Sequence, residues 1–293
     1  MISIVVISKD EPSLEETLGA LTKQADDLGT LVELIVVDAS DGRLARIAET
    51  HPAVVWIDYT APAGAGVTIP HQRNAGVRVA RGDVIVFTDA GCLPGTGWLD
   101  RLTAPLRSGE ETVTAGMITG GSLYDADAAH RGAAAYLDEC PTGNLAFLRT
   151  AFDEVGGFDE RFAYGSDIDF SWRLSDAGNR LRSVPDAVIS HDWGTGKRQL
   201  KRSYVYGQAR ARLYRKHSRR WRRLLTREPM VVVYPVFLLG LPVLLLAPLL
   251  PWVLLYPLLL LVPVWRNRGN GAVRVLVDHL AYGAGVLREL LRR

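Results

Sequence analysis

Acidic side chains close three apolar segments within the first 90 residues of the chain. They are Asp10 and Glu11, Asp38 and Asp41, and Asp89, and each lies at or just beyond the end of a run rich in Val and Ile. Carboxylates can accept hydrogen bonds from hydroxyl and N–H groups of a ligand, and they can ligate a hard divalent cation. Each residue alone would also suit a turn or a helix N-cap. Repetition at three segment ends favours a binding site.

The segments that carry these residues predict an α/β fold with a mainly parallel sheet. Residues 2–8, 32–40, 53–59 and 83–89 are strand-like, and most are continuous apolar runs typical of strands buried on both faces. Helix-like stretches separate them, which predicts repeated strand–helix units with helices on both faces of the sheet. Ligands of such sheets bind beyond the carboxyl ends of the strands, where the acidic residues lie.

Several other chemistries lack their sequence patterns. The chain has no P-loop, no HExxH, no Cys/His zinc spacing and no Gly-x-Ser-x-Gly elbow, and GAG at 64–66 lacks the spacing of a dinucleotide fingerprint. Two cysteines, Cys92 and Cys140, do not make a disulfide framework, so we expect reduced thiols.

The order of short motifs along residues 1–220 resembles that of family-2 inverting glycosyltransferases. The motifs are ISIVVISKDE, VVDAS, RNAGVRVARGDVIVFTDA, TGNLAF, VGGFDERF, GSDIDFSWRL and SHDWG. The resemblance implies the A-type glycosyltransferase fold, which is Rossmann-like, with a mainly parallel mixed sheet and flanking helices. It also implies inverting transfer of a sugar from a UDP- or GDP-sugar donor.

The resemblance further implies a donor site. Its residues would be Glu11, Asp38, Arg73, Asp89, Arg198 and Arg202. Glu11 and Asp38 correspond to residues that touch the ribose and base in the family. Arg73 corresponds to an arginine near the diphosphate, which a guanidinium can bind bidentately, although a surface helix cap is an alternative. Arg198 and Arg202 could close over the same diphosphate.

A divalent metal is implied at Asp89. This residue corresponds to the first carboxylate of the family's Asp-x-Asp motif, which holds Mg²⁺ or Mn²⁺ on the diphosphate. The second carboxylate position is Gly91, so this chain departs from the motif. Either Asp89, the donor phosphates, water and His191 hold the metal, or metal dependence is weak and basic side chains stabilise the leaving group. His191 could instead be a packed core histidine.

The general base is implied at Asp167. A carboxylate there would take the proton of an acceptor hydroxyl as the oxygen attacks the anomeric carbon. The glutamate that usually precedes it is Ser166 in this chain. Asp169 is the alternative base, but a carboxylate in the first turn of a helix has its own electrostatic explanation. The acceptor pocket is expected to include Thr142, Gly143 and Asn144, unless these form an ordinary turn.

Charge and hydropathy in the last hundred residues predict a membrane anchor. Residues 1–196 carry 15 Lys and Arg against 29 Asp and Glu, whereas residues 197–227 carry 13 Lys and Arg and no acidic residue. After Glu228 and Pro229, the 36 residues Met230–Trp265 are uncharged. They suit two crossings, near 231–247 and 250–265, or alternatively one kinked span. Cationic flanks on both sides of two crossings predict that the catalytic domain lies on the cytoplasmic side of the inner cell membrane.

These patterns predict a catalytic domain over residues 1–228 and a membrane region over residues 229–293. The membrane region would hold the hairpin and an amphipathic helix at the membrane surface. Anionic lipids are the expected partners of the basic block, and nucleic acid is not, because the block abuts the apolar run. Membrane placement predicts a lipid-linked acceptor for cell-envelope glycan or glycolipid synthesis. The absence of Gln-x-x-Arg-Trp predicts single addition rather than polymerisation.

Two other functions stay open. A non-catalytic relative that still binds nucleotide would explain Gly91 and Ser166. A sugar nucleotidyltransferase would have a related architecture, but those enzymes usually place a Gly-rich basic loop after the first strand. The acidic SKDEPSLEET found there argues against this second alternative.

Overall fold

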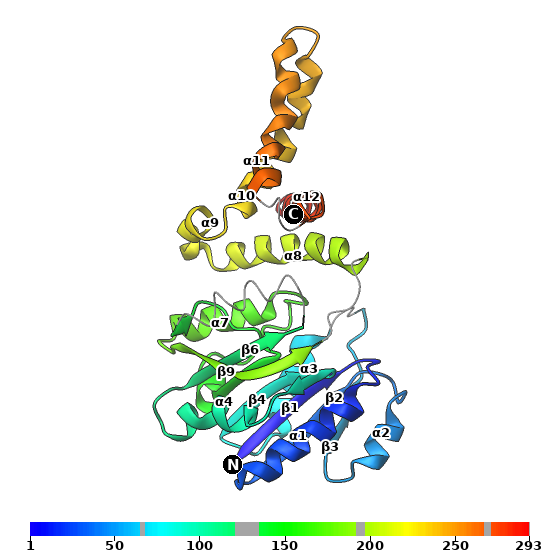
Figure 1. Ribbon diagram of the computed structural model, residues 1–293, viewed down its shortest axis with the longest axis vertical. Helices are drawn as coiled ribbons and strands as arrows, with labels where there is room; N and C mark the ends of the chain where they lie inside the picture. The colour runs from blue at the N-terminus through cyan, green and yellow to red at the C-terminus, as the bar shows by residue number, and fades with distance from the viewer. Residues whose placement is uncertain (65–67, 121–134, 192–196, 267–270, 293) are drawn as a thin grey trace. The chain divides into compact units, whose positions relative to one another are not determined.

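The computed structural model describes the chain in five stretches. These are residues 1–64, 68–120, 135–191, 197–266 and 271–292. The chain forms two compact units, Met1–Trp193 and Gly194–Arg293 (Figure 1). This boundary precedes the predicted one at residue 228, because the helix that follows residue 196 packs against the last helix of the chain.

A nine-stranded mixed sheet forms the centre of the first unit (Figure 1). The strands are β1 (Ile2–Ser8), β2 (Val32–Asp38), β3 (Val55–Asp58), β4 (Val84–Asp89), β5 (Cys92–Pro94), β6 (Val113–Thr119), β7 (Tyr136–Leu137), β8 (Asn144–Leu148) and β9 (Leu181–His191). Their order is β3-β2-β1-β4-β8-β6-β9-β5, and β7 pairs with β9. The pairs among β1 to β4 are parallel, as expected. Beyond β4 only the β6–β9 pair is parallel, so the sheet is less parallel than predicted.

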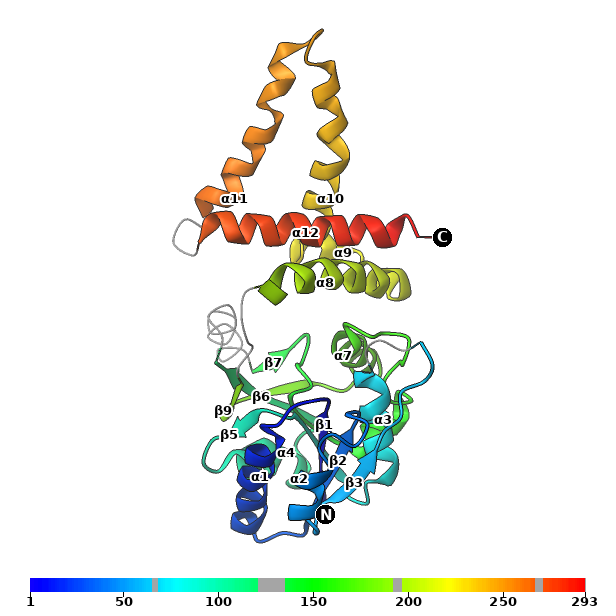
Figure 2. The same cartoon turned by 90° about the vertical axis from the view of Figure 1, so that its right-hand side faces the viewer.

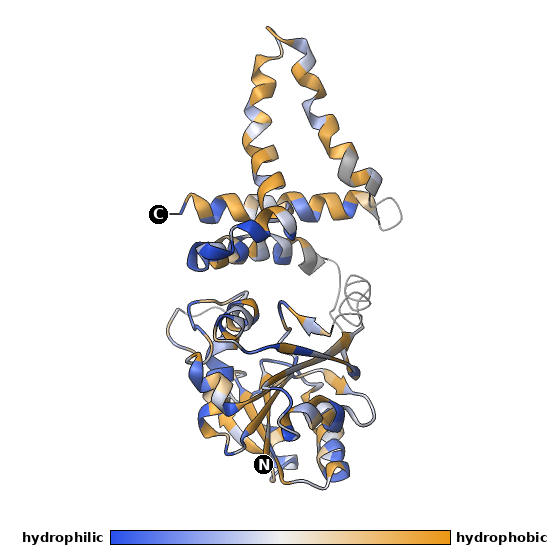
Figure 3. Ribbon diagram, turned by 90° about the vertical axis from the view of Figure 1, so that its left-hand side faces the viewer, coloured by the Kyte–Doolittle hydropathy of each residue, from blue (hydrophilic) through white to orange (hydrophobic). Residues whose placement is uncertain are grey.

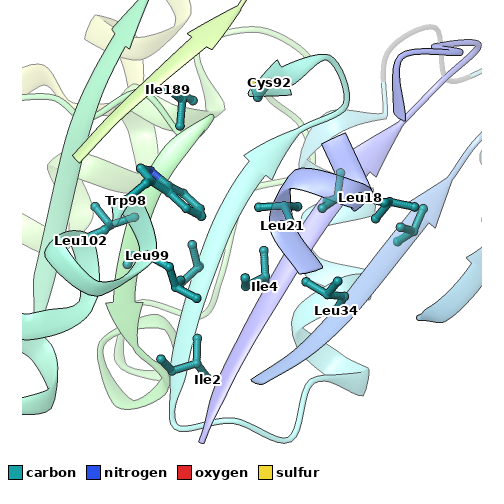
Figure 4. Packing of buried hydrophobic residues seen from close by; sticks show 14 of the residues in the cluster. Ile2, Ile4, Leu18, Leu21, Leu34, Cys92, Trp98, Leu99, Leu102 and Ile189 are labelled. Atoms are coloured by element: carbon teal, nitrogen blue, oxygen red, sulfur yellow. The ribbon is translucent and has the colours of Figure 1, made fainter. Parts of the chain in front are cut away.

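Helices cover both faces of this sheet. They are α1 (Leu14–Leu28), α2 (Ala45–Thr50), α3 (Ile69–Val79), α4 (Trp98–Arg107), α6 (Arg149–Glu154) and α7 (Ser166–Asp176). Alternate residues of β1 enter different cores: Ile4 packs with residues of α1 and α4, whereas Val5 packs with residues of α3, α6 and α7. Figure 4 shows the first core, with Trp98 beside Leu102. Burial on both faces explains the continuous apolar runs of the strands.

The second unit is helical. Its elements are α8 (Lys197–Lys216), η1 (Ser218–Arg220), α9 (Arg222–Thr226), α10 (Met230–Gly240), η2 (Leu241–Leu246), η3 (Pro251–Leu260), α11 (Leu261–Arg266) and α12 (Ala272–Leu290). Helices α8 and α12 pack closely through glycines on both sides. A Cβ on Gly207 would lie 2.0 Å from the carbonyl oxygen of Tyr282, and one on Gly285 would lie 2.0 Å from that of Tyr204. Only glycine allows the two backbones to approach this closely.

Two apolar arms form a helical hairpin in this unit (Figure 2). One arm is α10 with η2 and the other is η3 with α11, close to the two segments predicted from sequence. The rings of Phe237 and Tyr256 stack with centroids 5.0 Å apart, and the Tyr256 hydroxyl donates to the Phe237 carbonyl at 2.9 Å. Figure 3 shows apolar residues along both arms. In the described chain no single helix has the apolar length of a membrane span, whereas Ser218–Thr226 and Met230–Leu246, bent by 80°, reach it as a pair.

Four basic side chains of the segment 197–227 form ion pairs inside the second unit. Glu228 pairs with Arg210 and Arg223, each at 2.9 Å. Glu289 on α12 pairs with Arg212 at 2.9 Å and with Arg215 at 3.6 Å. The sequence-based prediction assigned these cations to lipid headgroups. It missed that two glutamates, Glu228 just after the segment and Glu289 on α12, neutralise part of this charge, because a run without acidic residues shows nothing of its spatial neighbours.

Candidate active site

The register of the central strands brings two predicted site residues to one edge of the sheet. In the ladder between β1 and β2, Ser8 pairs with Asp38, and in the ladder between β1 and β4, Ile7 pairs with Asp89. The two carboxylates therefore lie on β2 and β4, the two strands that flank β1, on either side of its end. A ligand that crosses the end of β1 would meet both.

Asp38 is buried with one oxygen left unsatisfied. Its side chain is 2% exposed, and Oδ1 accepts a hydrogen bond from Ser40 Oγ at 2.6 Å. Oδ2 has no hydrogen-bond partner in the described part of the chain, and neither does the buried hydroxyl of Ser8. Buried polar atoms are nearly always paired, because leaving one unpaired costs about 1–3 kcal/mol. The pair of unsatisfied atoms at the end of β1 therefore marks a place for a polar ligand.

Asp89 rests on a buried arginine. Arg73 Nη2 donates to Asp89 Oδ1 at 3.0 Å, and the arginine side chain is only 5% exposed, against 36% for the aspartate. The guanidinium also lies 5.8 Å from the ring centroids of Phe87 and Phe158. This burial excludes the alternative of a surface helix cap for Arg73. The arginine holds the Asp89 carboxylate in place through Oδ1. The other carboxylate oxygen, Oδ2, lies beside Gly143.

The Asp-Ala-Gly turn after β4 brings three further side chains together. Gly91 has φ +85°, a backbone conformation that favours glycine, and its N–H donates to Thr17 Oγ1 at 3.0 Å. A Cβ at this position would lie 3.1 Å from Ser13 Oγ, 3.8 Å from His191 Nε2 and 3.9 Å from Glu11 Cδ. Glu11 and His191, both predicted site residues, therefore border the position of the absent second carboxylate.

Cys92 lies beside this turn, opposite His191 in the β5–β9 ladder. Burial, with a further contribution from the charge of Asp89, raises the pKa of the Cys92 thiol to about 12. The thiol is therefore protonated at neutral pH and serves neither as a nucleophile nor as a thiolate ligand. The described residues contain no ready group of three His, Cys, Asp or Glu side chains that could hold a metal.

The predicted acceptor segment borders Asp89. A Cβ on Gly143 would lie 3.1 Å from Asp89 Oδ2, so the glycine leaves room beside the carboxylate. Thr142 is buried, and the N–H of Cys140 donates to Ser171 Oγ of α7 at 3.0 Å. The segment thus connects the edge at Asp89 with the helix that carries the predicted base.

Asn144 has a structural task that the sequence did not reveal. Its Oδ1 accepts from Trp98 Nε1 at 2.8 Å, and its Nδ2 donates to the carbonyls of Met117 and Ala187 at 2.8 and 2.9 Å. These bonds hold β6 and β9 where their register shifts after Gly116. Both amide hydrogens are used, so the geometry favours Thr142 and Gly143 over Asn144 for acceptor binding.

The two candidate bases on α7 have different environments. Asp169 is fully buried and pairs with Arg173 at 2.8 Å, so its carboxylate supports the helix. Asp167 is half-buried in the first turn, where Oδ1 accepts the N–H of Ile168 at 2.9 Å. Gly165, at φ +76°, turns the chain just before this helix. Accessibility favours Asp167 over Asp169 as the group that could meet an acceptor.

The remaining predicted residues lie in the second unit. Arg198 and Arg202 are both on α8, and the side chain of Arg198 lies outside the described residues. Their predicted role at the diphosphate stays a prediction.

Sequence reasoning missed Gln72 and Ser13. Gln72 is buried and its Nε2 donates to the carbonyls of Ser8 and Val37, which fixes the ends of β1 and β2 side by side. Ser13 Oγ donates to Glu11 Oε1 at 2.7 Å. Gln72 directly precedes the predicted Arg73, but a side chain that binds strand carbonyls leaves no pattern in one sequence.

Comparison with known proteins agrees with this geometry. The model for "Glycosyl transferase family 2" matches residues 3–158, and that for "Glycosyl transferase family group 2" matches residues 130–264. A pre-mycofactocin glycosyltransferase of Mycobacterium tuberculosis is 32% identical over 165 residues, which cover 50% of this chain and 34% of that protein. Glycosyltransferase AglE of Haloferax volcanii is 20% identical over 228 residues, covering 72% of this chain and 73% of AglE. The chain therefore spans about a third of the length of the mycobacterial relative.

Two solved structures share the fold. The mannosyltransferase PcManGT from Pyrobaculum calidifontis, in complex with GDP-Man and Mn²⁺, has a TM-score of 0.70 at 20% identity, covering 100% of this chain and 87% of that one. GalNAc-T7, with UDP, GalNAc and Mn²⁺, has a TM-score of 0.52 at 16% identity, covering 72% of this chain and 50% of that one. The mixed sheet and flanking helices are thus those of the A-type glycosyltransferase fold. The chain belongs to glycosyl transferase family 2, which confirms the predicted class of glycosyltransferase.

Proposed function

We propose that the chain transfers a sugar from a nucleotide-diphosphate sugar to a lipid-linked acceptor, with inversion, at the cytoplasmic face of the inner cell membrane. The observation that carries this proposal is the arrangement of two carboxylates on either side of the carboxyl end of β1. On one side, Asp38 has a buried oxygen without a partner among the described residues, and on the other, Asp89 accepts a hydrogen bond from Arg73. Two fold neighbours, PcManGT and GalNAc-T7, are complexes with GDP-Man and with UDP, which supports a nucleotide-sugar donor.

The donor would lie across the end of β1. The free oxygen of Asp38 would accept a hydrogen bond from a ribose hydroxyl or a base N–H, which satisfies the buried carboxylate. The diphosphate would then lie near Asp89, whose carboxylate is held by the ion pair with Arg73. The end of β2 would thus bind the nucleoside, and the end of β4, on the other side of β1, would bind the leaving diphosphate.

A divalent cation fits this second side. Asp89 and His191 would be its protein ligands, because a Cβ on Gly91 would lie 3.8 Å from His191 Nε2, and the space beside the turn is therefore bordered by an imidazole. Carboxylate oxygen and imidazole nitrogen are both suitable ligands for Mn²⁺-type cations. When bound, the cation would offset the charge that develops on the departing diphosphate.

Asp167 would act on the acceptor side. With a hydroxyl acceptor, the hydroxyl oxygen forms a bond to the anomeric carbon, the bond from that carbon to the diphosphate breaks, and the proton passes to the Asp167 carboxylate. Attack opposite the leaving group inverts the anomeric centre. An acceptor phosphate, already ionised, would need no such base. Gly143 and Thr142 would border the acceptor next to Asp89.

The second unit supplies the argument for a membrane acceptor. Each arm of the hairpin is about 28 Å long, from about 1.5 Å per residue in an α-helix and about 2.0 Å in a 3-10 helix, close to the roughly 30 Å of a bilayer's hydrocarbon core. Leu245, Leu249 and Trp252 at its tip are 81%, 79% and 67% exposed. Lipid would cover these side chains. Confining enzyme and acceptor to one membrane raises their effective concentration.

The test is a transfer assay with the full chain in lipid nanodiscs. UDP- and GDP-sugars are offered with polyprenyl phosphate, with a polyprenyl-diphosphate saccharide, which presents a hydroxyl, or with a soluble sugar acceptor. Asp167→Asn is compared on the hydroxyl acceptors with the exposed control Asp153→Asn. We expect glycosylation of the lipid carrier by the wild type and by Asp153→Asn. Transfer only to soluble acceptors would contradict the lipid-linked part. Nucleotide binding without turnover over the whole donor panel would favour a non-catalytic relative.

A further inference from the structure

We propose that Glu11 supplies the second carboxylate of the divalent-cation site whose first carboxylate is Asp89. The inference rests on the proposed function, because the cation belongs to the diphosphate side of the donor site. It assigns to Glu11 a role different from the ribose and base contact that the family resemblance implies.

The geometry at Gly91 carries this inference. A Cβ on this glycine would lie 3.9 Å from the carboxyl carbon of Glu11. The carboxyl carbon of an aspartate at position 91 would itself stand one C–C bond, about 1.5 Å, from that Cβ. The carboxylate of Glu11 therefore borders the small volume in which a carboxylate of residue 91 would lie. His191 Nε2, at 3.8 Å from the same Cβ, borders it as well.

The backbone at position 91 does not favour a side chain of its own. Its φ of +85° is strained for residues other than glycine, and Ser13 Oγ would stand only 3.1 Å from the added Cβ. The N–H of Gly91 is bound to Thr17 Oγ1, so the turn is fixed against the first helix. Ser13, just before α1, thus lies against the space that a side chain of residue 91 would fill. The carboxylate of Glu11 borders the same space.

The described hydrogen bonds of the Glu11 carboxylate orient it through only one of its two oxygens. Oε1 accepts both hydrogen bonds that are described for this side chain, from Ser13 Oγ at 2.7 Å and from Ser13 N at 3.4 Å. Oε2 accepts none from the described residues, and the side chain is exposed. One oxygen of Glu11 is therefore available to a ligand beside the turn.

The three protein ligands determine which cation the site prefers and why its binding depends on nucleotide. Two carboxylates and one imidazole suit Mn²⁺, and they leave positions for phosphate oxygens and water. These three side chains do not form a ready metal site among the described residues. The diphosphate must complete it, so we expect Mn²⁺ and nucleotide to strengthen each other's binding by the same factor.

The experiment compares nucleotide binding with and without Mn²⁺ in the full chain, by calorimetry in nanodiscs with UDP and GDP. The variants are Glu11→Gln and, as a matched control, Glu15→Gln, another exposed carboxylate at the start of α1. Loss of a metal ligand should cut the Mn²⁺-dependent gain in nucleotide affinity by about 10-fold or more, since even outer partners of metal ligands are worth 10- to 100-fold. In EDTA, Glu11→Gln and wild type should bind equally, and Glu15→Gln should keep the full gain.

Two results would overturn the inference. The first is a Glu11→Gln variant that retains the full Mn²⁺-dependent gain in nucleotide affinity. The second is a variant that weakens binding equally with Mn²⁺ and with EDTA, which would instead support a contact of Glu11 with the nucleoside. A wild type that binds neither nucleotide refutes the proposed function, and the role of Glu11 falls with it, because the diphosphate must complete the site. A wild type that binds nucleotide more tightly with Mn²⁺, beside a Glu11→Gln variant that shows the same gain, overturns the role of Glu11 alone.

Discussion

The two units differ in what they leave unsatisfied. In the first unit, apolar side chains are packed on both faces of the sheet, while Asp38 and Ser8 keep buried polar atoms without described partners. In the second unit, the buried carboxylate of Glu289 is bound by Arg212, while large apolar side chains stand exposed along the hairpin. An unsatisfied polar atom inside indicates a polar ligand, whereas apolar surface outside indicates an apolar environment. The comparison supports the proposal that the nucleotide sugar binds to the first unit and that lipid covers the hairpin of the second.

The largest effect is expected from Asp167→Asn in the first unit. An amide cannot take the proton of a hydroxyl acceptor, so kcat should fall by about 100- to 10,000-fold. Nucleotide affinity should stay at the wild-type level, because Asp167 would act on the acceptor side, whereas the nucleoside would lie at Asp38. Steady-state kinetics beside Asp153→Asn measures this. An equal loss in both variants would remove Asp167 from the chemistry.

Replacement of the buried Arg73 by leucine should lower the stability of the first unit and remove the side chain that positions Asp89. Asp89 would lose its hydrogen bond from the guanidinium, and the free energy of unfolding of the first unit should fall by about 1.5–3 kcal/mol, the usual worth of a hydrogen bond to a charged group. The exposed Arg78 on the same helix provides the control Arg78→Leu. Urea denaturation checks the prediction. Equal midpoints for the two variants would show that Arg73 does not support the edge of the sheet.

Replacement of Gly285 by leucine should affect the second unit alone. The new side chain would collide with the backbone of α8, where the Tyr204 carbonyl oxygen lies 2.0 Å from the added Cβ. We expect a loss of about 1–3 kcal/mol, as for other overpacked contacts, and faster proteolysis of α12. Val273→Leu, at an exposed position of the same helix, is the control. Nucleotide binding should be unchanged, and its loss would contradict the separation of tasks between units.

The smallest effect is expected from acid titration of Glu289. Although burial opposes it, hydrogen bonds and charge from Arg212, with the charges of Arg215 and Arg292, lower the pKa of this carboxyl. A lowered pKa stabilises the folded unit above the unfolded value of about 4.3, and this contribution is lost as pH falls through the folded value. Helix content measured from pH 6 to about 2 should therefore fall at acid pH. Glu289→Gln should show a flatter acid limb, and identical profiles would contradict the pairing.

Local patterns predicted much of the first unit. Continuous Val and Ile runs fixed the four parallel strands to within two residues, because burial on both faces selects such runs. The carboxylates at strand ends were found for the same reason. The antiparallel β8 and the register shift at Gly116 were not predicted, since strand order and bulges depend on distant partners.

Predictions that depended on spatial neighbours succeeded less well. The sequence offered Asn144 as a ligand group, but Trp98 and two strand carbonyls use its amide. The basic block indicated a charged surface, yet Glu228 and Glu289 neutralise part of it. The hairpin arms, in contrast, follow from the uncharged run itself. Partners that fold in from elsewhere leave no pattern in the segment that they contact.

The most direct test of the account is the binding of UDP and GDP to the full chain in nanodiscs, measured by calorimetry for the wild type and for Asp38→Asn. The amide keeps the size of the side chain but replaces one acceptor oxygen by a donor. The account predicts that the wild type binds one of the two nucleotides at one site per chain, and that Asp38→Asn binds it about 10-fold more weakly, in keeping with the loss of one hydrogen bond to a charged group. A wild type that binds neither nucleotide, or a variant that binds as tightly as the wild type, would contradict it.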